Sequence, residues 1–338
     1  MSFLVAFAVA LFLIFLSRKK NFGHDYISGD QKFHINPTPR TGGIAILLGF
    51  MISIFFGKHE VINSFLIPSI ILMTASVYED VYSSVKPIYR LFFIFLSVIS
   101  LVLINSLEIK SFGVSFLDYY LSTPIPNFIF TILTLSMLIN AFNIIDGFNG
   151  LLSGFSIIIL ASIAYLSFSL GEALVYDLSV TLLLAVIGFF ILNFPYGKIF
   201  LGDSGAYFLG MIIGFLLITI SRNPEVSTWF ALAVVIYPVY EIFFSIVRKK
   251  LFFNSPATQP DSFHLHMLVH KNLINCKLFN NKIFCNSFTS IIIWILSLFS
   301  IIPSLLWYDN SLVLFIVCLI FMVIYTVLYL KLLAMERK

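Results

Sequence analysis

The chain has 338 residues, of which 60% are hydrophobic and only 11% charged, and its formal net charge at pH 7 is +4. A water-soluble protein of this length could not bury so much apolar surface, so the composition excludes a soluble enzyme or binding module and predicts an all-α integral membrane protein. A net charge this small gives no indication of a nucleic-acid partner.

Eleven apolar segments approach the roughly 20 residues that a membrane-spanning helix needs. They lie at residues 2–17, 42–57, 61–77, 88–106, 126–142, 152–170, 174–193, 205–220, 229–246, 288–307 and 311–331. The first segment has neither a charged stretch before it nor a cleavage site of small residues, so we expect a retained span instead of a signal peptide. We expect residues 1–338 to form one polytopic domain, in which 247–287 is the largest loop.

The distribution of positive charge predicts the orientation. All but three of the 20 Lys and Arg residues fall in one set of loops, and the exceptions are Lys58, Lys110 and Arg222. Loops rich in Lys and Arg stay in the cytoplasm, so the amino terminus is expected outside and the carboxyl terminus inside. The opposite loops are short except for 107–125, where we expect an interfacial helix around residues 114–121.

The first polar cluster, residues 34–43, reads HINPTPRTGG and leads into the second apolar segment. Its prolines favour an extended backbone, and Gly42 and Gly43 allow the start of the helix to pack closely. Arg40 beside a helix amino end could hold an anion. The alternative is a turn in which Arg40 only anchors the cytoplasmic side.

Adjacent carboxylates, Glu79 and Asp80, stand at the predicted cytoplasmic end of the third segment. Two acids beside a bilayer are costly unless a positive charge shares them. A divalent metal ion, or Lys86 and Arg90, could supply that charge, and one carboxylate could serve as a general base. A solvated loop is the alternative.

Residues 140–154 read NAFNIIDGFNGLLSG and are the most polar part of an otherwise apolar region. Asn140, Asn143 and Asp146 are spaced by three, so on a helix they would share one face. The glycines between them would let a bulky ligand approach the backbone. The alternative is a helix end capped toward water.

Asp203 lies within a Gly-Asp-Ser-Gly sequence before the eighth segment. A carboxylate on open backbone at a helix start suits Mg²⁺, which takes one or two carboxylates together with water and phosphate oxygens. Alternatively, Asp203 is a plain N-cap.

The loop 247–287 contains a basic run that ends at Lys250, followed by His264, His266 and His270. Basic side chains and imidazoles are suited to binding a nucleotide diphosphate. The alternatives are a zinc site formed by these histidines and Cys276, and a plain positive-inside loop. We also expect Glu241 to pair with Arg248 or to face the site.

Five motifs in this order, over almost the whole chain, resemble the polyprenyl-phosphate N-acetylhexosamine-1-phosphate transferase superfamily, glycosyltransferase family 4. The resemblance implies an enzyme that transfers a HexNAc-1-phosphate, GlcNAc-1-phosphate or a deoxy relative, from a UDP-sugar to undecaprenyl phosphate and releases UMP. It implies Mg²⁺ as the cofactor, with Mn²⁺ as an alternative. It also implies an active site at the cytoplasmic face of a bacterial inner membrane, where the enzyme starts a surface polysaccharide such as O-antigen, and it is compatible with a homodimer.

The resemblance also implies roles for individual residues. The implied catalytic residues are Glu79, Asp80, Asp146 and Asp203, and the implied substrate-binding residues are Arg40, Asn143, Lys250, His264 and His266. Asp203 and Asp146 would hold the Mg²⁺, and Asp80, supported by Glu79, would deprotonate or align the lipid phosphate. Three positions depart from the family pattern: Glu79 replaces the first Asp of a pair, Asn149 replaces a second acid, and Met267 replaces a third His.

Two alternative functions stay open at this point. The first is a phospho-MurNAc-pentapeptide transferase of peptidoglycan synthesis, which activity with UDP-MurNAc-pentapeptide would identify. The second is a secondary transporter, for which we would expect acidic residues near the middle of the membrane and matching broken helices in two repeats. The acids of this chain cluster at one predicted surface instead, and no repeat is visible.

Overall fold

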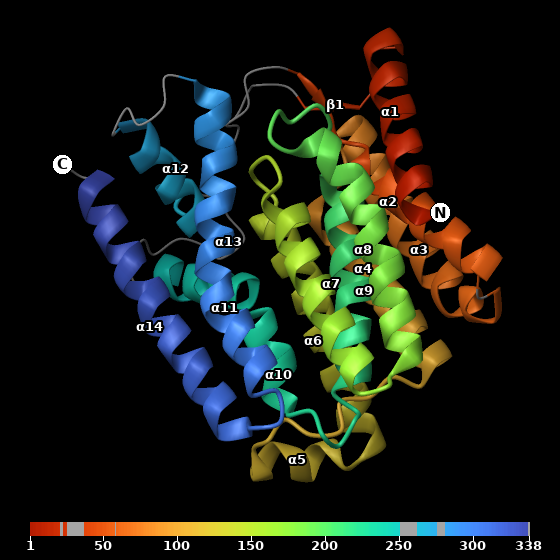
Figure 1. Cartoon of the computed structure of the whole chain (residues 1–338), viewed down its shortest axis with the longest axis vertical. Coiled ribbons are helices and arrows are strands. Elements are labelled where there is room, and N and C mark those ends of the chain that lie inside the picture. Colours follow the sequence, from red (N-terminus) through yellow and green to blue (C-terminus); the bar gives the residue numbers. More distant parts are fainter. Residues whose placement is uncertain (21–22, 26–36, 58, 251–261, 276–280, 337–338) are drawn as a thin grey trace.

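The computed structural model describes residues 1–20, 23–25, 37–57, 59–250, 262–275 and 281–336. These residues form helices and one short antiparallel pair of strands, β1 (His24–Asp25) and β2 (Thr38–Pro39) (Figure 1). The helices are α1 (Ser2–Lys20), α2 (Gly42–Gly57), α3 (His59–Tyr82), α4 (Pro87–Asn105), α5 (Ser115–Leu121), α6 (Pro124–Ile145), α7 (Leu151–Ser169), α8 (Ala173–Asn193), α9 (Gly202–Ile220), α10 (Thr228–Val234), α11 (Ile236–Arg248), α12 (Leu265–Asn275), α13 (Lys282–Leu306) and α14 (Ser311–Glu336).

Each of the eleven expected segments coincides with a helix or a pair of helices, which confirms an all-helical protein. Among the described residues, nine helices are long and apolar enough to cross a membrane, and α10 and α11 form a tenth candidate if they are counted as one span. The helix α2 has only 16 residues. The expected count of eleven spans therefore becomes nine or ten by length and composition.

The expected single span at 229–246 is broken, because α10 and α11 are bent by 74°. Pro238 lies in the first turn of α11, so its nitrogen cannot donate to the carbonyl of Val234, four residues earlier, and its ring crowds that carbonyl. The helix α10 ends at Val234. Proline thus accounts for the place of the break.

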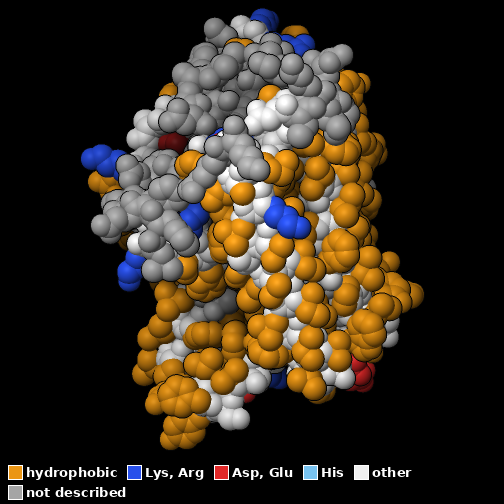
Figure 2. Space-filling view, turned by 90° about the vertical axis from the view of Figure 1, so that its left-hand side faces the viewer, with side chains coloured by type: hydrophobic (Ala, Val, Ile, Leu, Met, Phe, Trp, Pro, Cys, Tyr) orange, Lys and Arg blue, Asp and Glu red, His pale blue; other side chains and the backbone are white. Residues whose placement is uncertain are grey.

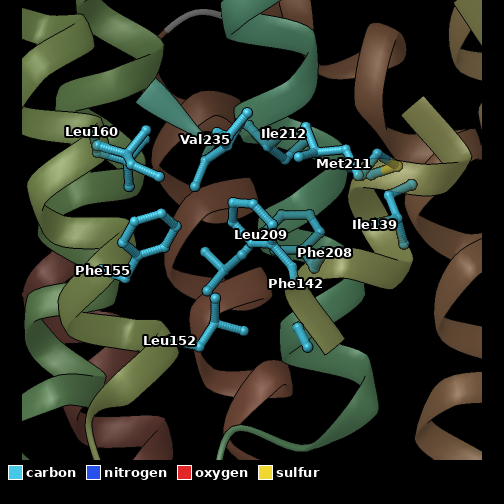
Figure 3. Packing of buried hydrophobic residues seen from close by; sticks show 14 of the residues in the cluster. Ile139, Phe142, Leu152, Phe155, Leu160, Phe208, Leu209, Met211, Ile212 and Val235 are labelled. Carbon is cyan, nitrogen blue, oxygen red and sulfur yellow. The ribbon is translucent and has the colours of Figure 1, made fainter. Parts of the chain in front are cut away.

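The helix α9 is the centre of the bundle, and every residue from Gly202 to Ile218 is buried. Phe208, Leu209, Met211 and Ile212 pack among side chains of α6 and α7 (Figure 3). A Cβ atom at Gly210 would lie 2.8 Å from the Cα of Ile139 in α6, which is closer than real Cβ contacts come. Glycine therefore lets the two helix backbones approach, as small residues do in membrane bundles.

Hydrophobic side chains cover most of the lower part of the face shown in Figure 2, and most of the Lys and Arg visible there lie in its upper half. The first residues of α2, α4 and α9 and the last residues of α3 and α6 meet at the same end of the bundle. The helix expected around residues 114–121 is present as α5, at the opposite end (Figure 1). Its Phe116 and Tyr119 side chains are exposed.

Candidate active site

The carboxylate of Asp203, in the first turn of α9, joins three separate parts of the chain. Its Oδ1 accepts hydrogen bonds from Arg40 Nη2 at 3.2 Å and from Asn143 Nδ2 at 3.0 Å. Its Oδ2 accepts one from Arg90 Nη1 at 2.6 Å, and the Tyr207 hydroxyl lies 3.5 Å away. The segment before α2, the start of α4 and the end of α6 therefore meet at this carboxylate, which is 7% exposed.

Asp80, at the end of α3, caps the amino end of α9. Its Oδ1 accepts from the Asp203 N–H at 2.7 Å, and its Oδ2 accepts from the Ser204 N–H at 3.0 Å and the Ser204 hydroxyl at 2.5 Å. The residue at the N-cap position, Leu201, provides no side-chain cap. Asp80 thus satisfies backbone N–H groups that a helix start leaves without partners. Asp203 is not the N-cap, the alternative considered from the sequence.

Gly202 makes this close approach feasible. Its φ is +75°, a conformation that favours glycine, and a Cβ there would lie 2.6 Å from Asp80 Oδ2 and 2.1 Å from the carbonyl oxygen of Arg40. A side chain at this position would push Asp80 away from the helix end.

The adjacent carboxylates Glu79 and Asp80 have different surroundings. The Oε2 atom of Glu79 accepts a hydrogen bond from the Val85 N–H at 2.8 Å, and its Oε1 lies 4.0 Å from Arg90 Nη1. Of the two cations expected to share the acids, Arg90 does so, whereas Lys86 is exposed. Glu79 therefore shapes the turn before α4 and lies beside the Asp203 cluster.

Arg40 carries a positive charge among three carboxylates. Its Nη1 lies 3.7 Å from Asp25 and its Nη2 lies 3.9 Å from Asp80, in addition to the contact with Asp203. Burial lowers the pKa of Arg40, but the negative charges of Asp203, Asp80 and Asp25 raise it, and the net shift is upward. The guanidinium therefore stays protonated. Asp25 was not expected at this site, because only the pairing of β1 with β2 brings it to Arg40.

Asn143 and Asp146 occupy the end of α6, but not as expected. The helix ends at Ile145, so Asp146 is the residue after it, with φ −80° and ψ 76°. The Asn140 amide donates to the Ser136 carbonyl within the helix. The predicted polar face of three residues is thus wrong, and only Asn143 reaches Asp203.

Asp146 nevertheless belongs to the electrostatic environment of the site. Burial raises the pKa of its carboxyl group to about 7, with Arg40 lowering it and Asp203 raising it. No hydrogen bond or ion pair to its carboxylate occurs within the described part of the chain. The carboxylate is therefore available to a cation.

Asn149 does not lie among these carboxylates. Its backbone N–H donates to Asn286 Oδ1 at 2.7 Å, its side-chain amide donates to the Pro195 carbonyl at 2.9 Å, and its carbonyl accepts from the Ser290 hydroxyl. Asn149 connects the turn after α6 to α13 and to the end of α8. An aspartate could not donate to Pro195. Met267, another departure from the family pattern, packs in the hydrophobic core.

The two histidines singled out from the sequence form a second cluster beside α11. The rings of His264 and His266 are parallel, with centroids 5.6 Å apart. His264 Nδ1 lies 2.9 Å from Glu241, so Glu241 faces this cluster, and Arg248 donates to the Phe263 carbonyl. Burial lowers the pKa of His266 to about 3, Glu241 opposes the shift and His264 adds to it, so His266 is neutral at pH 7.

Some predicted residues fall outside these clusters. Lys250 is exposed, and no hydrogen bond or ion pair among the described residues connects it to Asp203. His34 and the loop residues 251–261 and 276–280, including Cys276, lie outside the residues that the structure describes.

The donor set fits an open magnesium site. Mg²⁺ usually takes one or two protein carboxylates and completes its coordination with water and phosphate oxygens. Asp203 and Asp146 could supply two carboxylates. In the described part of the chain, no group of three or more His, Cys, Asp or Glu side chains is placed to hold a metal ion. Cys276, the fourth residue of the zinc alternative with His264, His266 and His270, lies outside those residues.

Most of the residues of this site lie in the part of the chain that matches a known protein family. Residues 62–221, which include Asp80, Arg90, Asn143, Asp146 and Asp203, match the family model described as glycosyl transferase family 4. The chain is 30% identical over 240 residues to a Sulfolobus acidocaldarius protein with the provisional name UDP-N-acetylglucosamine–dolichyl-phosphate N-acetylglucosaminephosphotransferase, covering 63% of this chain and 69% of that protein.

Two further relatives differ in the sugar that their names specify. The chain is 28% identical over 248 residues to the undecaprenyl-phosphate alpha-N-acetylglucosaminyl 1-phosphate transferase of Thermotoga maritima, covering 72% of each chain. It is 27% identical over 280 residues to the phospho-N-acetylmuramoyl-pentapeptide-transferase of Staphylococcus aureus, covering 76% of this chain and 87% of that protein.

Proposed function

Because this chain belongs to glycosyl transferase family 4, as one of the polyprenyl-phosphate HexNAc-1-phosphate transferases in that family, we propose that it transfers GlcNAc-1-phosphate, or a deoxy relative, from a UDP-sugar to undecaprenyl phosphate. The reaction forms a bond between a lipid phosphate oxygen and the phosphorus attached to the sugar. The bond from that phosphorus to the bridging oxygen breaks, and UMP leaves with the electron pair.

The observation that carries this proposal is the convergence of Arg40, Arg90 and Asn143 on the Asp203 carboxylate at one end of the bundle. Phosphoryl transfer depends mainly on in-line placement and on stabilising negative charge. Two guanidinium groups can bind phosphate oxygens in a fixed geometry, and Asp203 holds both of them side by side.

We assign separate tasks to the carboxylates. Asp203 and Asp146 would hold Mg²⁺, which when bound supplies positive charge to the transferring phosphate. Asp80 would position Asp203, because both of its oxygens already accept hydrogen bonds from the start of α9. This geometry supports a positioning role for Asp80, in place of the expected deprotonation or alignment of the lipid phosphate. Glu79 would hold the turn that presents Arg90.

We further propose that the site faces the cytoplasm of a bacterial cell and that the product begins a surface polysaccharide. The distribution of Lys and Arg supports this orientation, because only Lys58, Lys110 and Arg222 fall in the opposite set of loops. Residues 1–338 would act as one membrane domain, with the histidine segment contributing to the UDP-sugar site.

A phospho-MurNAc-pentapeptide transferase is the second candidate, because the relative from Staphylococcus aureus is matched over 87% of its length. The two functions use the same lipid acceptor and differ in the sugar that carries the UMP group. Their substrates can therefore be compared in one assay.

We expect purified protein in detergent to release UMP from UDP-GlcNAc in the presence of undecaprenyl phosphate and Mg²⁺, and to lose this activity with EDTA. UDP-GalNAc, deoxy-HexNAc donors and UDP-MurNAc-pentapeptide complete the panel. Preference for UDP-MurNAc-pentapeptide would establish the second candidate. If folded protein, assayed in the presence of undecaprenyl phosphate, releases no UMP from any of these donors, that result would contradict the proposed function.

A further inference from the structure

Two polar side chains on α11 face the two histidines. Tyr237 and Glu241 are four residues apart, so they lie one above the other on the same side of the helix. Their exposed fractions are 0% and 1%, and His266 is also 0% exposed. Polar atoms buried this deeply need hydrogen-bond partners, and those partners determine where the protons lie.

Glu241 determines the proton position on His264. Its Oε1 lies 2.9 Å from His264 Nδ1 and accepts a second hydrogen bond from the Leu265 N–H. An ionised carboxylate can only accept, so the Nδ1 atom of His264 carries a hydrogen. The parallel stacking of the two rings then holds His266 in a fixed orientation.

The proton position on His266 follows from counting partners. The Tyr237 hydroxyl lies 3.0 Å from His266 Nδ1, and His266 Nε2 is enclosed with no hydrogen-bond partner among the described residues. If the hydroxyl accepted from Nδ1–H, both its own hydrogen and the Nε2 lone pair would lack a partner. If the hydroxyl donates to Nδ1, only Nε2–H lacks one. The second arrangement leaves fewer buried groups unsatisfied.

The free edge of His266 lies against the turn that follows α6. A Cβ atom at Gly147 would lie 3.6 Å from His266 Nε2, and Gly147 directly follows Asp146. Glycine leaves this position without a side chain. The unpartnered N–H therefore lies beside the backbone that carries one of the site carboxylates.

We propose that Tyr237 is a positioning residue that donates its hydroxyl hydrogen to His266 Nδ1 and keeps His266 as the neutral Nε2–H tautomer, so that Nε2 donates to an acceptor oxygen of the UDP-sugar. The role toward the UDP-sugar rests on the proposed function. The tautomer itself does not depend on it, so the two can fail separately. Phe155 packs edge-on against the Tyr237 ring, with centroids 6.0 Å apart, and helps to orient the hydroxyl.

The test combines a spectroscopic and a kinetic measurement. In protein labelled with ¹⁵N-histidine, we expect the His266 signals, identified by their loss in His266→Gln, to show the neutral Nε2–H form. In Tyr237→Phe we expect a mixture of tautomers and a KM for the UDP-sugar raised about 3- to 10-fold, the effect of losing one hydrogen bond, with a much smaller change in kcat. A wild-type His266 that carries its proton on Nδ1, or on both nitrogens, would overturn the proposal.

Matched variants separate positioning from a general loss of packing. Tyr240→Phe removes a hydroxyl from the same helix, one that contacts Thr326 at 2.9 Å, and should leave both the His266 signals and KM unchanged. The amide nitrogen of glutamine can occupy the place of Nε2, whereas that of asparagine is nearer to Nδ1. His266→Gln should therefore retain more UDP-sugar affinity than His266→Asn, and the reverse order would refute an Nε2 donor.

Discussion

Asp203→Asn is expected to lower kcat/KM for UMP release by roughly 10³-fold, the size of effect seen when a preorganised electrostatic group at a reaction centre is removed. The substitution retains the shape of the side chain but removes the charge that Arg40 and Arg90 share. It would also remove the carboxylate assigned to Mg²⁺. Activity should be measured in reconstituted vesicles at saturating Mg²⁺.

Asp118→Asn provides the control for this experiment. Asp118 lies in α5, at the opposite end of the bundle, where it accepts hydrogen bonds from the Ser111 hydroxyl and the Phe112 N–H. Its loss should leave kcat/KM unchanged. If the Asp203 variant inserts, folds and turns over at the wild-type rate, Asp203 has no part in the chemistry.

Asp80→Asn is expected to reduce both stability and turnover. Asparagine has one acceptor oxygen, whereas both Asp80 oxygens accept from α9, so the new NH₂ group must face a backbone N–H. A buried donor left without an acceptor costs about 1–3 kcal/mol. We expect a lower melting temperature in detergent and a large loss of UMP release, because the first turn of α9 carries Asp203.

The melting temperature distinguishes this role from that of a general base. A base replaced by its amide would lose turnover while the protein melted as before, and that result would remove Asp80 from the positioning role. Glu79→Gln is the matched comparison, because glutamine still accepts from the Val85 N–H. Its melting temperature should change less than that of Asp80→Asn.

The sequence predicted the helical class and the approximate position of every long helix, because apolar runs of this length have few alternatives in a membrane. It did not predict the break at Val235, because the hydropathy of the run at 229–246 does not show that Pro238 ends one helix and begins another. It also placed Asp146 on a helix, because a spacing of three does not reveal where the helix ends.

The candidate site was predictable as a set of residues, but its contacts were not. Arg40 and Asp203 are recognisable because only 11% of the chain is charged, and Asn143 because it stands in a polar stretch of an otherwise apolar region. The capping of α9 by Asp80 joins positions 123 residues apart, and the approach of Asp25 to Arg40 depends on a strand pair of two residues each. Neither leaves a local pattern in the sequence. The partners of Asn149 likewise come from α13 and the end of α8.

The close approach of α9 to α6 at Gly210 affects how substrate preference can change in this enzyme. With so little space between the two backbones, α9 cannot slide or turn without steric overlap, so Asp203 is a fixed reference point. Laboratory evolution toward a new sugar should therefore accumulate its changes on the histidine side, around α11 and α12. Substitutions along α9 should be eliminated by misfolding before they can alter specificity.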